Sequence, residues 1–507
     1  MFDIRKFIRP PAILLVLTLT SFVITGCAAP AQRPEHTARN RNFYQIFVGS
    51  FRDSDGDGIG DLLGIVEKLD YLSETLGVQG IWLTPIHPSP TYHKYDVMDY
   101  FAIDPDFGTM EDFELLIYEA NARNIVIILD FVINHTSSQH PWFLAALEEI
   151  RTGAEPFYKD FYVFVEQPSG SGYYPTYNDL FYHAHFWSEM PDLNLDNEYL
   201  REEIRNIARF WLDKGVSGFR LDAVPHIFPS QQAKNIEFWT WFKDMCREIY
   251  EDVFLVGEVW SHRQEILPYF ATGMSFFNFP FAGHDGIINV HLRSRDGAGL
   301  AAEIERFDAE IRAINPDAVN SIFLSNHDTG RSAGWLIEPN RQRLAAAIYL
   351  LIPGNPFIYY GEEIGMFGSG VDPNLRAGMF WSTTDSTGIP DNPPGSGDVR
   401  PPDYGVAEQL DDPSSLLNYY RAILALKAEH QDIFDSIALK VEVESRYIAA
   451  IRTGNVIVMH NLSDEPVSVS LDVLAVSLAG YVSPTGESAT ESDSVLTLPP
   501  YSSAVLR

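Results

Sequence analysis

Cysteine is almost absent from this chain of 507 residues, which contains only Cys27 and Cys246. Cys246 falls in a stretch with helical periodicity, and no second cysteine in the body of the chain is available to pair with it, so no structural disulfide is expected. A large core must provide the stability, with a bound metal as a further means. Apolar residues make up 46% and aromatic residues 13% of the chain, which is enough for such a core.

Positive charge is also scarce. The chain has 36 lysine and arginine residues, nine of them lysine, against 69 acidic residues, and its net charge is −33. A surface of this sign repels phosphate backbones, which argues against a nucleic-acid partner. Strong acidity with little lysine is typical of proteins adapted to salt, because dissolved ions screen the repulsion between like charges.

Long apolar runs are few, and one of them lies near the N-terminus. Basic residues precede the apolar stretch 12–24, which is shorter than the roughly 20 residues that span a membrane. The stretch ends at Ile24-Thr25-Gly26-Cys27, which resembles a bacterial lipobox. We therefore expect a signal peptide at 1–26, a lipid on Cys27, a tether at 27–41 and an exported lipoprotein of the cell envelope, held at a membrane. The alternative is an ordinary cleaved signal.

From residue 42 onward, short apolar runs alternate with amphipathic helical stretches. The run at 125–131 is almost uninterrupted, as in a parallel strand covered on both faces. The stretch 62–76 is expected to form one helix, and Thr109 and Asp112 have the spacing of a helix N-cap. Eight strand-then-helix units predict an α/β fold of the (β/α)₈ TIM-barrel type, with strands at 43–48, 80–83, 125–131, 218–222, 254–258, 274–277, 322–325 and 357–360.

Two segments depart from this alternation. A long aromatic-rich insertion follows the third strand, at 136–194, and the segment 433–507 changes to apolar–polar alternation with a hairpin turn at Gly454-Asn455. We therefore predict a barrel formed by 42–135 and 195–432, an inserted domain and a C-terminal antiparallel β domain.

Charged residues stand where the predicted strands end. Asp130 lies at the end of the third strand, Asp222 at the end of the fourth and Glu258 at the end of the fifth, and Asp328 follows the seventh. The carboxyl ends of barrel strands carry the chemistry of such folds, and carboxylates without partners are costly to bury, so these side chains should face a shared polar mouth. Arg220 shares a strand face with Asp222 and can keep it ionised.

Carboxylates grouped at one mouth suit the cleavage of an acetal. One attacks the anomeric carbon, a second is held protonated and delivers a proton to the leaving oxygen, and a third binds sugar hydroxyls. The alternative is a structural network of ion pairs at the barrel rim.

Four segments carry a family resemblance. Asp130–His135, Gly218–His226, Gly257–Trp260 and Phe323–Asp328 resemble the four signature regions of the α-amylase family of glycoside hydrolases, in the family's order. The resemblance covers nearly all of the chain after residue 42. It implies the barrel, the domain inserted after the third strand and a C-terminal antiparallel β-sandwich. It also implies retaining hydrolysis of α-linked glucans through a covalent glycosyl-enzyme intermediate.

The resemblance assigns roles to individual residues. It implies Asp222 as the nucleophile, Glu258 as the general acid/base and Asp328 as the stabiliser of the transition state. It also implies a set of substrate-binding residues, namely Tyr95, His135, Arg220, His226 and His327.

Specificity is expected from residues around these motifs. The segment 190–194 resembles the marker of an intermediary group between oligo-1,6-glucosidases and neopullulanases. The resemblance also implies internal α-1,4 cleavage, because Ala223 stands where 1,6-specific relatives tend to carry Val, and Tyr92 where exo-acting glucosidases carry an Asp. We therefore expect an α-amylase acting on starch, glycogen and maltooligosaccharides. Two positions depart from typical α-amylases: Pro225 replaces the Lys that often accompanies His226, and Lys94 replaces a Gly. The alternatives are a neopullulanase or cyclomaltodextrinase, an α-glucosidase, or a non-catalytic surface protein that binds glucan.

An acidic loop follows the first strand and has oxygen-bearing side chains at alternate positions, with glycines that permit a tight wrap. This pattern suits Ca²⁺, and the α-amylase resemblance implies a calcium site here. The alternative is a solvated acidic turn. The expected ligands are the carboxylates and one carbonyl of Asp53, Asp55, Asp57, Ile59 and Asp61.

Overall fold

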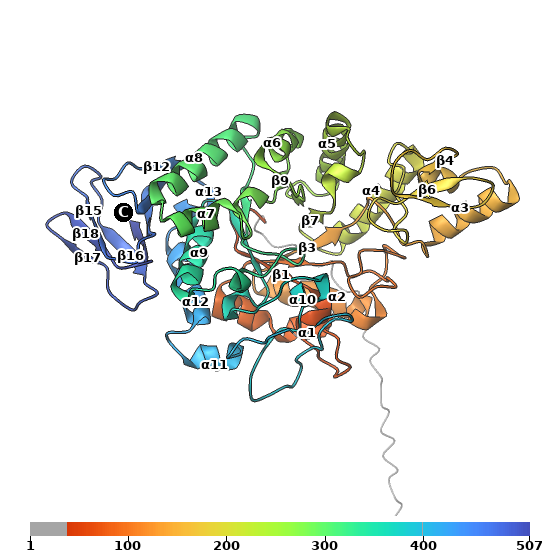
Figure 1. The fold of residues 1–507 in the computed structure, drawn as a ribbon. Coiled ribbons are helices and arrows are strands. Elements are labelled where there is room, and N and C mark those ends of the chain that lie inside the picture. Colours follow the sequence, from red (N-terminus) through yellow and green to blue (C-terminus); the bar gives the residue numbers. More distant parts are fainter. Residues whose placement is uncertain (1–37, 398) are drawn as a thin grey trace, which may run out of the picture.

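The computed structural model describes residues 38–397 and 399–507, and its centre is a barrel of eight parallel strands (Figure 1). The strand order is β10-β11-β1-β2-β3-β7-β8-β9, and every neighbouring pair is parallel. The fold-class prediction is therefore confirmed. The strands are β1 (Phe43–Ile46), β2 (Gly80–Leu83), β3 (Val126–Phe131), β7 (Gly218–Leu221), β8 (Phe254–Gly257), β9 (Ser275–Phe276), β10 (Ser321–Ile322) and β11 (Asn355–Tyr359).

The barrel is closed between its two shortest strands. A single parallel bridge joins Phe277, just after β9, to Ser321 in β10. Aromatic rings fill the interior, where the ring of Phe43 lies 4.7 Å from that of Phe357. Gly80 lies against the Phe43 ring, and a Cβ at this position would come within 2.5 Å of it, so the ring leaves room only for glycine.

Helices surround the barrel (Figure 1). Thr109 and Asp112 form the predicted capping box at the start of α2. The single helix expected over residues 62–76 is instead divided into α1 and a π-helix at Tyr71–Leu76. In the part of the chain that the structure describes, no helix is long and apolar enough to cross a membrane. The barrel helices are α1 (Leu62–Glu67), α2 (Met110–Ala122), α4 (Glu198–Asp213), α5 (Gln232–Ile249), α6 (Arg263–Ile266), α7 (Ile287–Ser294), α8 (Gly297–Ile314), α9 (Pro339–Leu351), α10 (Asp372–Leu375), α11 (Val406–Asp411), α12 (Leu416–Glu429) and α13 (Asp432–Asp435).

The segment after β3 projects from one side of the barrel (Figure 1). It contains α3 (Pro141–Thr152) and a small antiparallel sheet of β4 (Phe164–Val165), β6 (Phe181–His183) and β5 (Tyr173–Pro175). A bridge between His135 and Asp192 joins its two ends, so the inserted segment leaves and returns beside the end of β3.

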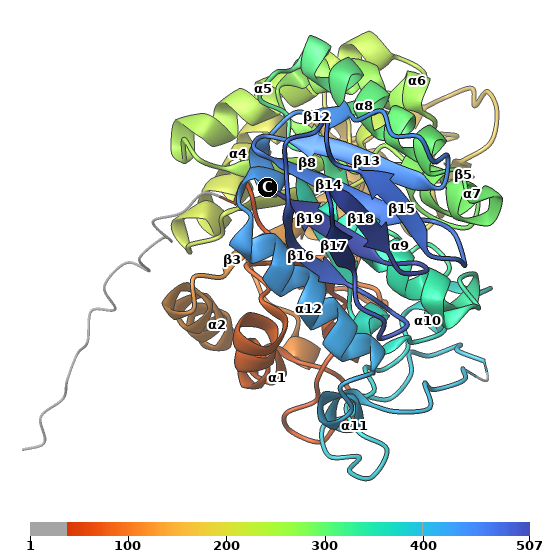
Figure 2. The ribbon, with the colours of Figure 1, turned by 90° about the vertical axis from the view of Figure 1, so that its left-hand side faces the viewer.

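Two antiparallel sheets form the C-terminal part, which packs beside α8 and α12 (Figure 2). Apolar side chains of both sheets share one core, in which Met459 and Leu496 are fully buried. Gly454-Asn455 forms the predicted hairpin turn between β13 and β14. The sheets are β12-β13-β14-β19-β16 and β15-β18-β17, with strands Ala438–Lys440, Ile448–Thr453, Val456–Asn461, Val467–Ser470, Leu478–Val482, Thr490–Ser492, Val495–Leu498 and Ser503–Leu506 in chain order from β12 to β19.

The chain enters the barrel at the N-terminal ends of the strands. The backbone N–H of Arg41 donates to Asn355 Oδ1 over 3.0 Å, at the start of β11. Its guanidinium donates to the backbone oxygen of Asn124 over 2.7 Å, just before β3. Arg41 therefore fastens the entering segment to the end of the barrel away from the strands' carboxyl ends.

Candidate active site

A cavity of about 340 Å³ opens at the carboxyl ends of the barrel strands. Six of the eight residues predicted to be catalytic or substrate-binding line it, namely Tyr95, His135, Asp222, His226, Glu258 and Asp328. The other two, Arg220 and His327, are each 1% exposed and contact the lining residues from below. The structure thus brings all eight together, although they span more than 230 residues of sequence.

The guanidinium of Arg220 is bound to three carboxylates. Its Nη1 donates to Asp130 Oδ1 over 2.8 Å and to Asp222 Oδ1 over 2.6 Å, and its Nη2 lies 2.9 Å from Glu258 Oε1. Because Asp130 and Arg220 are register partners in β3 and β7, the barrel geometry itself sets the first of these contacts. One buried cation therefore compensates several acidic groups that would otherwise be costly to bury.

The turn after Asp222 fixes the position of Glu258. Ala223 adopts a left-handed backbone conformation with φ of 51°, which is unusual for a residue with a side chain. In this conformation its N–H donates to Glu258 Oε2 over 3.0 Å. The Glu258 carboxyl is thus held between the Arg220 guanidinium and a backbone N–H.

Burial dominates the electrostatics of these acids. Desolvation raises the pKa of Asp222 to about 6 against the opposing effect of Arg220. Desolvation likewise raises the pKa of Glu258 to about 7, and the neighbouring charges of Asp222 and Asp328 act in the same direction. Near pH 6.5, Asp222 is therefore mostly ionised while Glu258 is mostly protonated, which is the division of labour that acetal cleavage needs.

A chain of hydrogen bonds supports the floor of the cavity. Burial lowers the pKa of His327 well below its usual range, so its ring is neutral. Gln45 donates to Nδ1 of His327 over 2.7 Å, which leaves the proton on Nε2 to be donated to the Tyr95 hydroxyl over 2.5 Å. Tyr95 in turn donates to Asp130 Oδ2 over 2.9 Å. The Tyr95 ring is parallel to that of His327, with an interplanar angle of 2°.

Asp328 is held from the opposite side by Arg376. Nη2 of Arg376 donates to Asp328 Oδ1 over 2.8 Å, and its Nε donates to the backbone oxygen of His327 over 3.0 Å. Nη1 donates to the hydroxyl of Tyr92 over 2.9 Å. Asp328 therefore has a cation partner of its own, separate from the guanidinium that binds Asp222 and Glu258.

Aromatic rings line the remainder of the cavity. The ring centroids of His226 and Phe186 lie 5.3 Å apart, and the ring centroid of His185, in the inserted segment, lies 4.3 Å from that of His226. Trp260, which is 59% exposed, stacks on Phe279 at 5.6 Å with an interplanar angle of 15°. Exposed ring faces beside acidic groups suit a sugar, since its C–H faces pack on rings and its hydroxyls bond to carboxylates.

Comparison with known proteins agrees with this geometry. The model of the family described as the α-amylase catalytic domain matches residues 45–436. The chain belongs to the α-amylase family. Alpha-amylase 3 of Dictyoglomus thermophilum is 41% identical over 477 residues, which cover 90% of this chain and 91% of that protein.

Two solved structures extend the comparison with the α-amylase family to three dimensions. Amy13B of Eubacterium rectale has a TM-score of 0.89 and 36% identity, with 94% of this chain and 97% of that chain covered. An α-amylase from H. orenii has a TM-score of 0.81 and 36% identity, with 92% and 99% covered. The chain is thus an enzyme of the glycoside hydrolase class, as the sequence predicted.

Some residues of this α-amylase family site carried no role in the sequence interpretation. The sequence predicts for Asp130 only a place at a strand end, whereas the structure shows that it joins Arg220 to Tyr95. Gln45 was not singled out, although it fixes the tautomer of His327. The one local signal for Asp130 is its position at the carboxyl end of a buried strand. Nothing near Gln45 in the sequence points to a residue 282 positions away.

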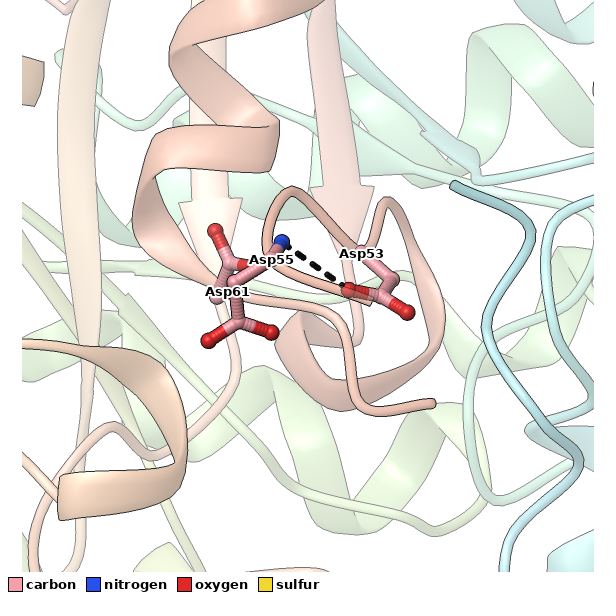
Figure 3. Close-up of side chains that lie close together, drawn as sticks. All are labelled: Asp53, Asp55 and Asp61. Atoms are coloured by element: carbon pink, nitrogen blue, oxygen red, sulfur yellow. Dashed lines mark hydrogen bonds between the residues drawn. The ribbon is translucent and has the colours of Figure 1, made fainter. Parts of the chain in front are cut away.

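The acidic loop after β1 brings Asp53, Asp55 and Asp61 together (Figure 3). One carboxylate oxygen from each lies within 4.8 Å of the others, and in the described residues this is the acidic group that could hold a metal ion. Asp57 is not part of this group, and its Oδ1 accepts a hydrogen bond from the N–H of Ile59 over 2.7 Å. Oxygen donors in a glycine-containing loop are of the kind that Ca²⁺ prefers.

The same loop is tied to its surroundings. Asp53 Oδ2 accepts from the N–H of Gly58 over 2.9 Å, and Asp61 Oδ1 accepts from the N–H of Gly64 over 2.7 Å as the N-cap of α1. The N–H of Asp391, in the long loop before α11, donates to the backbone oxygen of Gly58 over 2.8 Å. The loop thus connects β1, α1 and the rim of the cavity.

Proposed function

We propose that this enzyme is a retaining α-amylase that cleaves internal α-1,4-glucosidic bonds of starch, glycogen and maltooligosaccharides. The observation that carries the proposal is the binding of Asp222 and Glu258 to the two terminal nitrogens of one buried guanidinium, at the edge of a ring-lined cavity. Retaining glycosidases use two carboxyl groups about 5–5.5 Å apart, one as the nucleophile and one as the acid/base.

In the first step, Asp222 attacks the anomeric carbon while Glu258 donates its proton to the leaving oxygen. The bond from the anomeric carbon to that oxygen breaks, and a bond to Asp222 forms. Arg220 favours the ionised form of Asp222, whereas burial keeps the proton on Glu258. Asp328 offers negative charge to the positively charged sugar ring of the transition state, and Arg376 fixes its orientation.

In the second step, Glu258 is ionised and removes a proton from water as the water attacks the anomeric carbon. This attack breaks the bond to Asp222 and restores both carboxyl groups to their starting states. Tyr95, His135 and His226 contact the sugar in this proposal, with Tyr95 as the ring on which it stacks, and His327 supports Tyr95 through its hydroxyl. Two displacements on one carbon retain its configuration.

The test is the release of reducing sugar from soluble starch by residues 28–507, compared with the Asp222→Asn variant. A range of short maltooligosaccharides in chromatography, absent with the variant, is the expected result. Glucose alone would favour an α-glucosidase, and panose-type products from pullulan would favour a neopullulanase. Starch binding without any release by the wild type would point to a non-catalytic glucan-binding protein.

We further propose that the acidic loop binds Ca²⁺ through Asp53, Asp55 and Asp61, with Asp57 and the carbonyl oxygen of Ile59 completing the ligand set. The bound ion would hold the loop against the barrel and stabilise the fold. The proposal is supported by the proximity of the three carboxylates and by their position in a loop fixed at both ends.

We also propose that the protein is exported and anchored in the cell envelope through a lipid on Cys27. Cys27 and the signal segment 1–26 lie outside the described residues, so this proposal rests on the sequence motif. Labelling of the expressed protein with a radioactive fatty acid, lost in the Cys27→Ser variant, is the expected result. Release of an unlabelled protein into the medium would favour the ordinary cleaved signal.

A further inference from the structure

The turn 223–228 follows Asp222 and begins in an unusual backbone conformation. Ala223 has a φ of 51°, in the left-handed region that favours glycine, and the 3₁₀ segment Val224–His226 comes directly after it. A residue with a side chain keeps such a conformation only where the surrounding structure enforces it. The contacts that hold this turn are therefore part of the construction of the site.

The turn carries groups that act in the catalytic cavity. The N–H of Ala223 donates to Oε2 of Glu258 over 3.0 Å, and the N–H of Val224 donates to the backbone oxygen of Glu258 over 3.2 Å. His226, further along the turn, lines the cavity. A displacement of the turn would thus remove hydrogen bonds from Glu258 and shift a substrate-binding ring.

Helix α5 holds the turn from behind through two side chains. Asn235 and Trp239 are four residues apart on this helix, so they share one face of it. Nδ2 of Asn235 donates to the backbone oxygens of Pro225 over 2.9 Å and of Phe228 over 3.0 Å, and its Oδ1 accepts from the N–H of Phe228 over 2.9 Å. Nε1 of Trp239 donates to the backbone oxygen of Val224 over 3.0 Å.

Both side chains are buried, with Asn235 1% and Trp239 0% exposed. A buried amide is costly to desolvate unless its hydrogen bonds are made, and the turn provides the partners of Asn235. Removal of either side chain's donor would leave a carbonyl group of the turn without that partner. Neither residue is among those that line the cavity, so an effect of either on catalysis passes through the turn.

The hydrogen bond from Ala223 also acts on the proton of Glu258. Burial raises the pKa of Glu258 to about 7, whereas donation by Ala223 to the carboxyl group favours its ionised form and lowers the pKa. The other charged groups that face Glu258 are Asp130, Arg220, Asp222 and Asp328. Among these, the guanidinium of Arg220 lowers the pKa and the carboxylates raise it. Loss of the Ala223 contact would therefore raise the pKa of Glu258.

We propose that Asn235 and Trp239 are positioning residues for Glu258, and that they act through the turn 223–228. They hold the N–H of Ala223 on Oε2 and so set the orientation of the carboxyl group towards the leaving oxygen. The inference rests on the proposed function, because it takes the role of Glu258 as acid/base from it. It assigns a catalytic consequence to a helix that supplies no lining residue to the cavity.

The test compares Asn235→Ala and Trp239→Phe with the matched control Trp241→Phe, each in the full chain. Trp241 lies two residues further along α5, so its side chain lies on the other side of the helix, where its ring contacts Arg201 and Phe238. kcat/KM is measured as a function of pH for maltoheptaose and for α-maltosyl fluoride. Circular dichroism establishes that each variant is folded.

For maltoheptaose, Asn235→Ala should move the alkaline limb of kcat/KM to higher pH, because the pKa of Glu258 rises. It should also lower kcat/KM about tenfold, since the proton is delivered from a less well aligned group. kcat/KM for the fluoride should stay unchanged, because fluoride leaves without a proton. Trp239→Phe, which keeps an aromatic ring and removes the donor, should change both quantities in the same direction by less. Trp241→Phe should match the wild type.

If Asn235→Ala does not fold, Trp239→Phe decides alone. An unshifted alkaline limb in the folded Trp239→Phe variant would overturn the proposal. Equal losses of kcat/KM on the two substrates would also overturn it, since they indicate a general effect on the fold rather than on proton donation. Absence of the alkaline limb from the wild type would instead contradict the role of Glu258 in the proposed function.

Discussion

The pH dependence of kcat/KM follows from the two acids at the centre of the cavity. Asp222 must be ionised to attack, so activity falls as pH drops below its pKa of about 6. Glu258 must be protonated to release the leaving group, so activity falls as pH rises above its pKa of about 7. Because the two values lie close together, the acidic and alkaline limbs meet near neutral pH and a narrow bell-shaped profile is expected.

The assay measures initial rates on a maltooligosaccharide far below KM, in buffers of constant ionic strength. α-Maltosyl fluoride serves as the comparison substrate, since fluoride leaves without protonation and the alkaline limb of kcat/KM should disappear. Glu258→Gln should lose most activity on the oligosaccharide. With the fluoride it should release a burst of about one equivalent and then turn over slowly, because the glycosyl-enzyme lacks the base that activates water. The exposed Glu265→Gln should behave as the wild type. The same alkaline limb with both substrates would refute the assignment of the upper pKa to Glu258.

Three further predictions concern specificity, metal and salt. Tyr92→Asp places a carboxylate beside Arg376 and should shift the products of starch towards glucose in chromatography; unchanged product lengths from a folded variant would contradict this. Calcium at 100 times its Kd should add about 2.7 kcal/mol to the free energy of unfolding, which is measured as a higher Tm. The Asp53→Asn variant should not show this increase. An equal Tm of the wild type in chelator and in calcium would argue against the site. Raising salt from about 0.1 M to about 1 M shortens the screening length from about 10 Å to about 3 Å and should raise the Tm of a chain with net charge −33; activity that falls steadily with salt would contradict adaptation to it.

Much of the fold could be predicted because local patterns determine it. The apolar run at 125–131 became β3, and the Gly454-Asn455 turn became a hairpin because glycine reaches a positive φ of 56° at no steric cost. The helix expected at 62–76 was only partly right. Its apolar spacing is compatible with both an α-helix and a π-helix, and packing decides between them.

Site residues at the ends of strands could be predicted from the sequence. Contacts that depend on how neighbouring strands are paired could not. Asp222 and Glu258 follow apolar runs, so a shared mouth could be inferred. The contact of Asp130 with Arg220 requires knowledge of which residues face each other across β3 and β7. The support of His327 by Gln45 joins the first strand to the seventh, and no sequence spacing encodes it.

The entry of the chain at the N-terminal ends of the strands bears on the proposed lipid anchor at Cys27. Arg41 is fastened beside the starts of β11 and β3, whereas the catalytic cavity opens at their opposite ends. An enzyme attached to a surface through the segment before Arg41 would turn its cavity outward, towards polymers too large to approach the surface closely. Attachment would then confine the enzyme to the cell without shielding it from granular or branched substrate.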